Sequence, residues 1–563
     1  MNKYTLKIFM ICLTLLLVAA AQPALGSGWA QFHMNAQHTG YSDSTAPDTN
    51  FTAWISEDIG AQPSSSLVVA DGLIYVNCGN ENVTALNMYT GKNEGLKVNG
   101  PGDNGLDSWA SPCYYNGNIY RARTDACNGG PMAADGKIFQ SDWGGNHYYC
   151  YNESGYNHGE DTSDEFWNFT VSGYAQGTPA YYDGEVYLTS WGYAYNGSGN
   201  GHVYCVYVNN GTQKWHKDIP LDCCGSASLN TSSGILYVTT YNFGDDGDLY
   251  ALYMDNGTEY WNRSIMRTDS TPAIDDNGYI YVCGGCRGYS DMVTYCFAPN
   301  GTKMWNTTAS DQIGDWTCSV AVADGKVFVG KPTTEWGPWG APYYAMGCDG
   351  TYALNASNGN IIWSYEGGGC SPIVADGMIF TIGDDGKVYS FGKKTYDFTV
   401  GAGTDHFAYE GEVSSVKPSS STVPNGNIAA YSNIESDNEV REVFTTSNTG
   451  KYAAQRFVFS IDSNMQQWID TINVTWNGKA YHDSAGDGAY LYIWNGTGYE
   501  NLDDNSVDTD GTLTGEVISG ISNYINSDNV TVLVVQKNAQ TSDLFNTYQS
   551  HIETDYVKLV VTP

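Results

Sequence analysis

Residues 321–329 read Ala-Val-Ala-Asp-Gly-Lys-Val-Phe-Val, two short apolar runs joined by Asp324 and Gly325. An Asp-Gly or Asn-Gly pair between apolar runs is typical of a two-residue β-hairpin turn, where glycine adopts the positive φ that the turn requires. From residue 136 onward such turns recur every 44 to 52 residues. The turn glycines of the whole series are Gly72, Gly136, Gly184, Gly234, Gly278, Gly325 and Gly377.

Two further elements repeat in phase with these hairpins. A third strand begins with Tyr-Ala-Leu or a variant of it, and its seven copies start at Thr84, Tyr149, Tyr204, Tyr250, Tyr295, Tyr352 and Tyr389. A fourth strand carries Asn-Gly and then a tryptophan, at Trp215, Trp261, Trp305 and Trp363, with Trp167 in a degenerate copy. Four short strands in a period of 40 to 50 residues predict an all-β chain built on a β-propeller. We expect the tryptophans to be buried between neighbouring blades.

The ends of the repeat series predict how the ring closes. The last copy, near residues 387–394, lacks its tryptophan strand, and the segment Asn50-Phe-Thr-Ala-Trp54 supplies one. We therefore expect an N-terminal strand to complete the final blade. One hairpin signal, at Gly117, lies only 19 residues before Gly136 and has no third strand of its own. Seven blades are predicted, and eight with one truncated is the alternative.

The repeat resembles that of the PQQ-like β-propellers, the family named for pyrroloquinoline quinone dehydrogenases. That family also includes members without enzymatic activity, similar to outer-membrane assembly lipoproteins. The opening Trp29-Ala-Gln-Phe32 and His38-Thr-Gly-Tyr41-Ser resemble the lead-in of secreted members. The resemblance covers residues 29–398. It implies the fold and leaves two functions open, because one fold supports many activities.

A different pattern follows the repeats. Residues 455–460, 470–476, 490–494, 530–536 and 555–561 alternate apolar and polar side chains, which is typical of half-buried strands. They predict a β-sandwich of jelly-roll type. The expected organisation is a signal peptide over residues 1–26, the propeller over 27–400 and the sandwich over 401–563.

Composition and the N-terminus indicate an extracellular protein. Lys3 and Lys7 precede an apolar run that ends in small residues, as in a secretory signal, and no transmembrane segment is expected in the mature chain. A net charge of −36 argues against a nucleic-acid partner. Fifteen N-x-S/T sequons fit a glycoprotein, with Asn82, Asn196, Asn256 and Asn495 as candidate sites. The acidic, tyrosine-rich style resembles archaeal surface proteins, methanogens in particular.

One set of residues is expected at the mouth of the propeller channel, because the first strands of the blades converge there. The set is Trp109, Cys113, Asp222, Cys223, Cys224, Asp315, Trp316, Cys318 and Cys370. Aromatic rings, carboxylates and thiols suit a small polar ligand, a cation or a soft metal. The alternative is a plugged, structural channel in which cysteines link neighbouring blades, Cys318 to Cys370 for example. A local disulfide is expected between Cys283 and Cys286.

Two cofactors have candidate sites in the sequence, pyrroloquinoline quinone and calcium. Cys223-Cys224 resembles the vicinal disulfide that lies against the quinone in quinoprotein dehydrogenases, but arginines are few, so PQQ is not expected. Calcium could bind Asp504, Asp508 and Asp510, whose spacing resembles a calcium loop without the glutamate of an EF-hand. No catalytic residue is assigned. The sequence predicts a secreted or cell-surface scaffold that binds proteins or glycans, and a PQQ-dependent oxidoreductase using the channel is the alternative.

Overall fold

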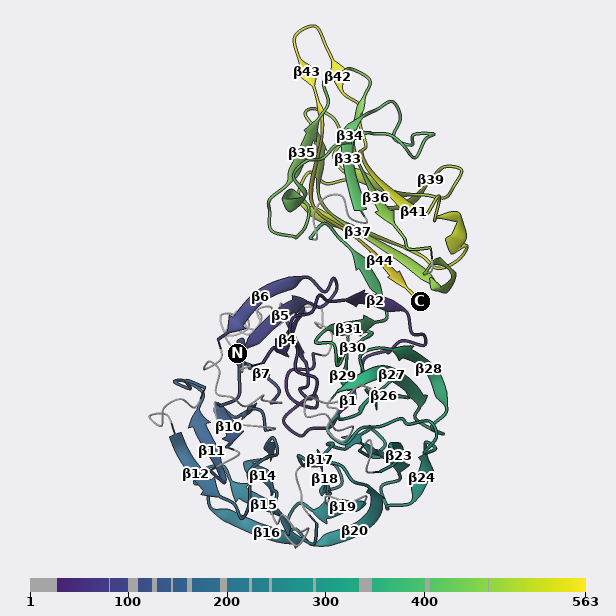
Figure 1. Cartoon of the computed structure of the whole chain (residues 1–563). Coiled ribbons are helices and arrows are strands. Elements are labelled where there is room, and N and C mark those ends of the chain that lie inside the picture. Colours follow the sequence, from purple (N-terminus) through teal and green to yellow (C-terminus); the bar gives the residue numbers. More distant parts are fainter. Residues whose placement is uncertain are drawn as a thin grey trace, which may run out of the picture.

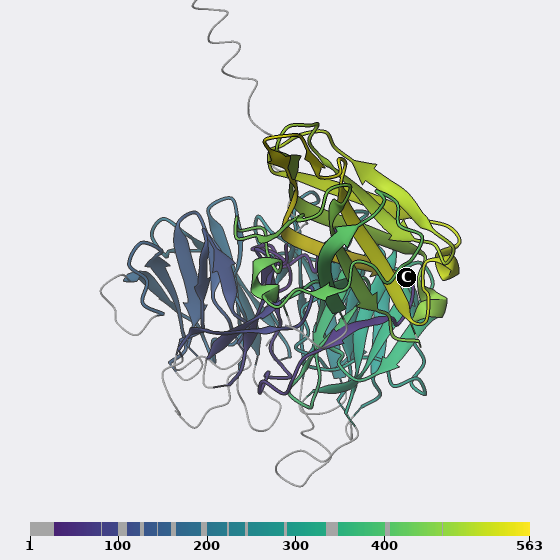
Figure 2. The same ribbon diagram turned by 90° about the horizontal axis from the view of Figure 1, so that it is seen from above.

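The computed structural model describes residues 28–563 except 80–81, 100–109, 124–128, 143–144, 159–164, 193–199, 222–224, 242–245, 287–289, 334–346, 400–405 and 464. Within them the regular secondary structure is almost entirely β-strand, arranged as a ring of sheets followed by a second β module. Figure 1 looks along the axis of the ring, and Figure 2 shows its sheets from the side. The predicted all-β propeller is confirmed.

Five sheets of the ring consist of four consecutive antiparallel strands each. The first is β3 (Val68–Ala70), β4 (Leu73–Asn77), β5 (Val83–Asn87) and β6 (Asn93–Val98). The second is β9 (Met132–Ala134), β10 (Lys137–Ser141), β11 (His147–Asn152) and β12 (Glu165–Thr170). The third is β13 (Ala180–Tyr182), β14 (Glu185–Ser190), β15 (Gly201–Tyr207) and β16 (Gln213–Ile219). The fourth is β17 (Ser228–Asn230), β18 (Ile235–Thr239), β19 (Asp246–Tyr253) and β20 (Glu259–Met266). The fifth is β21 (Ala273–Ile274), β22 (Ile280–Gly284), β23 (Val293–Phe297) and β24 (Lys303–Asn306).

Two more sheets take a strand from the N-terminal region. One is β25 (Ala321–Ala323), β26 (Lys326–Pro332), β27 (Cys348–Asn355) and β28 (Ile361–Glu366), with β1 (Tyr41–Ser42) parallel to β25. The other is β29 (Cys370–Ala375), β30 (Met378–Ile382) and β31 (Val388–Phe391), completed by β2 (Thr52–Ile55). Strand β2 pairs antiparallel with β31. The expectation that the N-terminal strand completes the last sheet is confirmed.

The irregular hairpin at Gly117 forms β7 (Cys113–Tyr115) and β8 (Asn118–Tyr120), which pair only with each other among the described residues. Strand β7 contacts both β3 and β9, so the hairpin lies in the ring between the first two sheets. In the described residues the ring therefore holds seven sheets of four or five strands and one two-stranded hairpin.

The hairpin turns have the geometry that their sequence predicts. Asp324 and Gly325 have φ of 50° and 68°, and Ala323 pairs with Lys326 across the turn. Two consecutive positive φ values define a type I′ turn, whose twist matches that of the strands it joins. Asp71-Gly72, Asp135-Gly136, Asp183-Gly184 and Asp376-Gly377 also have two consecutive positive φ values, whereas at Gly234 and Gly278 only the glycine does.

The repeated tryptophans lie at the interfaces between sheets, as expected. The indole N–H of each donates to a backbone carbonyl of the next sheet: Trp215 to Met254 at 2.9 Å, Trp261 to Pro299 at 2.9 Å and Trp305 to Ala356 at 2.8 Å. Each ring lies over the next Asn-Gly turn, where a Cβ on Gly257 would come within 2.5 Å of Trp215. Trp54 on β2 donates to Met88 at 3.0 Å and so joins the last sheet to the first.

The second module consists of two antiparallel sheets over a shared core. One sheet is β32 (Lys394–Tyr396), β44 (Ser550–Thr562), β37 (Thr471–His482) and β40 (Gly511–Val517), with β35 (Glu442–Thr445) also on β44. The other is β34 (Gly426–Asn427), β33 (His406–Val413), β36 (Tyr452–Ser460), β41 (Asn529–Gln536), β38 (Ala489–Trp494) and β39 (Tyr499–Asp504). Outside both lie the hairpin β42 (Thr541–Ser542) and β43 (Thr547–Tyr548) and three 3₁₀ turns, η2 (Tyr431–Asn433), η3 (Gln466–Trp468) and η4 (Ile521–Asn523).

The two modules are joined by shared strands and core residues. Strand β32 pairs with β44 and so belongs to a sheet of the second module. The boundary at residue 400 stays a prediction. Phe51, just before β2, packs into the core of the second module. No helix in the described part of the chain is long and apolar enough to span a membrane.

We predict that Trp261→Ala lowers the free energy of unfolding by about 3–5 kcal/mol, because it opens a cavity between two sheets and removes the bond to Pro299. Tyr260 on the same strand is 45% exposed, so Tyr260→Ala is the matched control and should change stability little. Chemical denaturation of both variants measures the difference. Equal, small effects would show that the tryptophan is not an interface residue.

Candidate functional site

The axis of the propeller is filled by the segment from Trp29 to Ser44, here called the axial segment. The innermost strand of each sheet has one edge that faces the axis, and among the described strands only β25 has a strand partner there, the short β1 of the axial segment. The axial segment supplies hydrogen bonds to these edges in ring order. Its carbonyls accept from the central amide of successive inner strands: Trp29 from Val69, Ala30 from Tyr114, Ala36 from Tyr181, Gln37 from Leu229, Thr39 from Ile274 and Gly40 from Val322.

Side chains of the axial segment complete this circuit at two positions. The Gln31 amide bonds both the N–H and the carbonyl of Ala133 on β9, at 2.9 and 3.0 Å. The Ser44 hydroxyl accepts from the Gly377 N–H at 2.8 Å, on the last sheet. The axial segment thus contacts all seven sheets and the β7–β8 hairpin, in the order in which they follow one another along the chain.

Two histidines of the axial segment are buried on the axis. The His33 ring nitrogens lie 2.9 Å from the His38 carbonyl and 3.0 Å from the Val320 carbonyl. His38 Nδ1 donates to the Ala227 carbonyl at 3.0 Å, while its Nε2 is buried without a partner in the structure. Burial lowers the pKa of His38 to about 3, with a smaller contribution from His33. The imidazole is therefore neutral at physiological pH.

The structure gathers some, but not all, of the residues expected at the channel mouth. Asp315, Cys318 and Cys370 come together at one end of the axis. Trp316 lies beside them, against Arg267. Cys113 does not join them, because the β7–β8 hairpin buries it against Tyr120 and Ala133 in a separate cluster. Trp109, Asp222, Cys223 and Cys224 lie outside the described residues.

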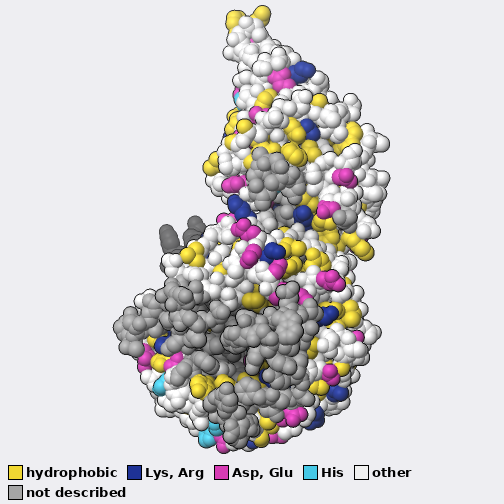
Figure 3. Space-filling model, in the orientation of Figure 1, with side chains coloured by type: hydrophobic (Ala, Val, Ile, Leu, Met, Phe, Trp, Pro, Cys, Tyr) yellow, Lys and Arg dark blue, Asp and Glu magenta, His cyan; other side chains and the backbone are white. Residues whose placement is uncertain are grey.

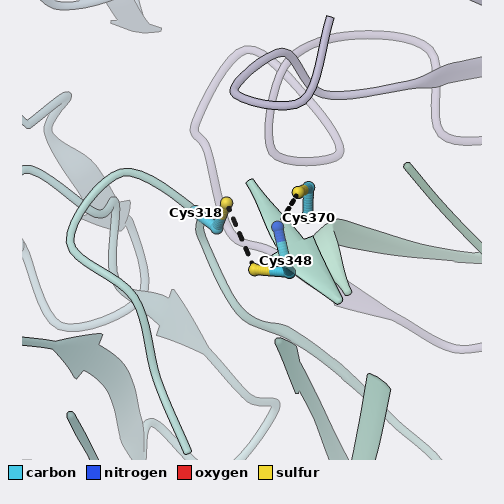
Figure 4. A group of neighbouring side chains, drawn as sticks. All are labelled: Cys318, Cys348 and Cys370. Atoms are coloured by element: carbon cyan, nitrogen blue, oxygen red, sulfur yellow. Dashed lines mark hydrogen bonds between the residues drawn. The ribbon is translucent and has the colours of Figure 1, made fainter. Parts of the chain in front are cut away.

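A third cysteine, Cys348, joins Cys318 and Cys370 (Figure 4). The three sulfur atoms lie within 4.8 Å of one another, with Cys348 Sγ 4.0 Å from Cys318 Sγ. The Cys348 N–H donates to Cys370 Sγ at 2.9 Å. Cys348 was missed because it begins a third strand rather than a first strand, so the repeat pattern does not align it with the others.

The pKa values of the thiols in this cluster are shifted in different directions. For Cys370, burial is outweighed by hydrogen bonds from Cys318 and Cys348, which lower its pKa to about 6. For Cys318, a hydrogen bond with Cys348 lowers the pKa. The hydrogen bond with Cys370 and burial both raise it and together prevail, so the pKa rises to about 12. Burial raises the pKa of Asp315 well above its usual range, and Cys318 adds to the effect. Of the three thiols, Cys370 is the one whose pKa is lowered.

No disulfide joins two of the described cysteines. The expected disulfide between Cys283 and Cys286 is wrong, because the Cys283 thiol is directed to the Cys318 carbonyl, 2.9 Å away. Cys318 and Cys370 do lie close together, but they are also unbridged.

Aromatic rings surround Arg267 at the same mouth. Its guanidinium carbon lies 5.1 Å from the ring centres of both Tyr241 and Trp316. Trp191 stacks on Tyr241 with a centroid distance of 6.4 Å. Nearby, burial raises the pKa of Asp269 to about 8, with a further contribution from Asp315.

This donor set does not fit pyrroloquinoline quinone. The quinone has three carboxylates, which call for several arginines or lysines. Among the described residues Arg267 contacts the aromatic rings of this mouth. The half-buried carboxyl of Asp269 and the buried carboxyl of Asp315 are its neighbours. The pair Cys223 and Cys224 falls outside the described residues.

The acidic residues expected to bind calcium do not form one group. Asp504 pairs with Lys537 at 2.5 Å, and Asp508 is exposed. Asp510 instead lies within 4.8 Å of Asp437 and Asp555, on strands and loops that are distant in sequence. Arg441 pairs with Asp510 at 3.1 Å and offsets part of this negative charge.

The candidate glycosylation residues differ in exposure. Asn256 is exposed in its turn, and Asn82 and Asn495 are half-buried. Asn196 lies outside the described residues. Modification at these positions stays a prediction.

Comparison with known protein families covers both modules. Residues 103–288 and 290–397 match the family described as outer membrane protein assembly factor BamB. Residues 403–563 match a family described as an uncharacterized protein, C-terminal domain.

Individual relatives are distant. An uncharacterized protein of Archaeoglobus fulgidus is 36% identical over 111 residues, which are 19% of this chain and 18% of that protein. The match thus spans less than a fifth of the relative's length. Among solved structures, BamB from Moraxella catarrhalis is 12% identical, with a TM-score of 0.35 over 62% of this chain and 96% of that one. Quinohemoprotein alcohol dehydrogenase ADHIIG from Pseudomonas putida HK5 is 10% identical, with a TM-score of 0.37 over 65% and 80%.

The buried His38 predicts a specific acid sensitivity. Its pKa is about 3 in the folded protein and 6.5 ordinarily, so protonation favours the unfolded chain. The contribution of His38 to the free energy of unfolding should be fully present above pH 6.5. It should fall by about 1.4 kcal/mol per pH unit as the pH drops toward 3.

The measurement is denaturant unfolding at pH 8, 6.5 and 4.5. His38→Asn should flatten the dependence, since asparagine tolerates the positive φ of 55° at this position. His216→Asn, on an exposed outer strand, is the control and should keep the wild-type slope. A His38→Asn slope equal to that of the wild type would contradict the assignment.

Proposed function

The chain belongs to the family described as outer membrane protein assembly factor BamB, and on that premise we propose that it is a secreted or cell-surface scaffold that binds other proteins. The observation that carries the proposal is the axial segment. It fills the channel with the chain's own backbone and side chains from β3 to β29. A propeller plugged in this way offers its outer surfaces, rather than a through channel, for binding.

A projecting hairpin supports the proposal. Leu544 and Phe545, between β42 and β43, are 93% and 90% exposed. The hairpin forms the far end of the second module in Figure 1, and hydrophobic side chains colour that end in Figure 3. Large apolar side chains presented this openly are typical of contact residues that enter a pocket on a partner.

The turn that presents these residues is held by hydrogen bonds. Asp543 Oδ1 accepts from the N–H groups of Phe545 and Asn546 at 2.7 and 2.8 Å. The Tyr548 hydroxyl donates to Asp543 Oδ2 at 3.0 Å. An ordered turn loses little conformational entropy on binding, which favours a specific contact.

The alternative function is oxidation by a quinone bound at the channel mouth, and Arg267 between Tyr241 and Trp316 is the observation that favours it. The scarcity of cationic partners for three carboxylates weighs against it. Incubating the purified chain with PQQ and Ca²⁺, and then with alcohols and sugars, separates the two functions. A redox dye serves as the electron acceptor, and its reduction measures turnover. We expect no dye reduction above that of protein without PQQ. Sustained dye reduction would overturn the scaffold proposal.

Protein binding is tested by replacing Phe545 with a benzoyl-phenylalanine photo-crosslinker in the full chain on the surface of source cells. We expect a discrete, protease-sensitive adduct. The same probe at Tyr260, an exposed aromatic of the propeller, is the control and should not form it.

For the partner recovered, Leu544→Ser together with Phe545→Ser should weaken binding by about 30-fold, as for a contact worth about 2 kcal/mol. An adduct that forms equally at Tyr260, or one that contains only carbohydrate, would contradict protein recognition by the hairpin.

A further inference from the structure

We propose that Cys318, Cys348 and Cys370, together with Asp315, form a closed structural site for Zn²⁺. Three thiols converge at one point from three separate segments: the loop before β25, the start of β27 and the start of β29. Three sulfur ligands and one carboxylate oxygen suit a borderline-soft divalent cation that favours tetrahedral coordination.

The spacing of the sulfur atoms fits metal coordination. Zn–S bonds of about 2.3 Å in a tetrahedral site place two sulfurs about 3.8 Å apart. Here Cys348 Sγ and Cys318 Sγ are 4.0 Å apart, and the three sulfurs all lie within 4.8 Å of one another. A disulfide needs a separation of about 2.05 Å and would leave the third thiol without a partner.

Asp315 is the carboxylate beside the cluster and the candidate for the fourth ligand. Its Oδ2 lies 3.9 Å from Cys348 Sγ. Asp315 is not one of the three groups whose ligand atoms all lie within 4.8 Å of one another, so its side chain would shift toward the sulfurs to complete the site. The carboxylate is oriented by the Trp316 N–H, 2.7 Å from Oδ1, and by the Thr317 hydroxyl, 3.3 Å from Oδ2. Contacts of this kind orient metal ligands and hold them in place.

The burial of the group favours a structural role over a catalytic one. Cys318 is 2% exposed, and Cys348 and Cys370 are fully buried. Structural zinc sites are closed in this way, whereas catalytic ones keep an open position. Binding would release the protons of the thiols to solvent as the metal takes their place.

The position of the cluster indicates what the metal would do for the fold. Cys318 and Cys348 belong to the sheet of β25–β28, and Cys370 begins the next sheet, which is completed by β2. A metal bound by all three would connect these two sheets where the ring closes. Because the metal binds only the folded chain, it should raise the temperature of unfolding.

The chain offers a matched control. Cys205 occupies the third-strand position that Ala85, Ala251 and Ala353 hold in other sheets, and it is buried away from the three thiols. Cys205→Ala therefore removes a buried thiol without touching the proposed site.

The experiment uses the reduced full-length chain with Zn²⁺ or Co²⁺. We expect one Zn²⁺ at the cluster, X-ray absorption with three sulfurs at about 2.3 Å and one oxygen at about 2.0 Å, and sulfur-to-cobalt charge-transfer bands with Co²⁺. The single variants Cys348→Ser and Cys370→Ser should each lose these bands and the rise in unfolding temperature on adding metal. Cys205→Ala should retain both. The absorption spectrum of the wild type tests the site even if a variant fails to fold.

Three results would overturn the proposal. The first is a reduced, folded chain that binds neither ion. The second is charge-transfer bands that persist in both serine variants. The third is Cu(I) held by the three thiols in place of Zn²⁺, or a disulfide between two of them in the protein as purified.

Discussion

The structure depends on pairing the inner edges of its sheets. Each sheet begins at the axis with a strand whose inward edge would be unpaired without the axial segment, and unpaired backbone groups in a buried position are costly. The axial segment removes this cost because its carbonyls accept one hydrogen bond from an amide of successive inner strands, from Val69 to Val322. Its next residues form β2, which completes the last sheet, so one stretch of chain both fills the axis and closes the ring.

The axial segment also determines which parts of the propeller remain available for a functional site. Because His33 and His38 are buried on the axis, the channel is part of the core rather than a passage. What remains is the mouth with its thiols and Arg267, and the outer surface with the projecting hairpin. The thiols are closed off and suit a structural metal, so the proposed protein binding would take place at the outer surface.

The repeating features could be predicted from the sequence, because turn geometry and strand alternation are local. The Asp324-Gly325 type of turn and the tryptophans at sheet interfaces follow from a few adjacent residues, and Trp54 followed from a gap in the series. The candidate site depends on contacts between distant segments. Cys348 joins Cys370 through the packing of two sheets, and Asp510 joins Asp437 and Asp555 across the second module. The axial segment has no repeat of its own, so its route around the axis has no periodic signal.

The most direct test of this account is hydrogen–deuterium exchange of a chain that begins at residue 45, which keeps β2 but lacks the axial segment. The account predicts that the amides of Tyr181, Leu229 and Ile274 exchange faster than in the full chain, because their acceptors are gone. Amides inside the same sheets, such as that of Val186, should change less. Unchanged protection at the three inner-strand amides would contradict the central role of the axial segment.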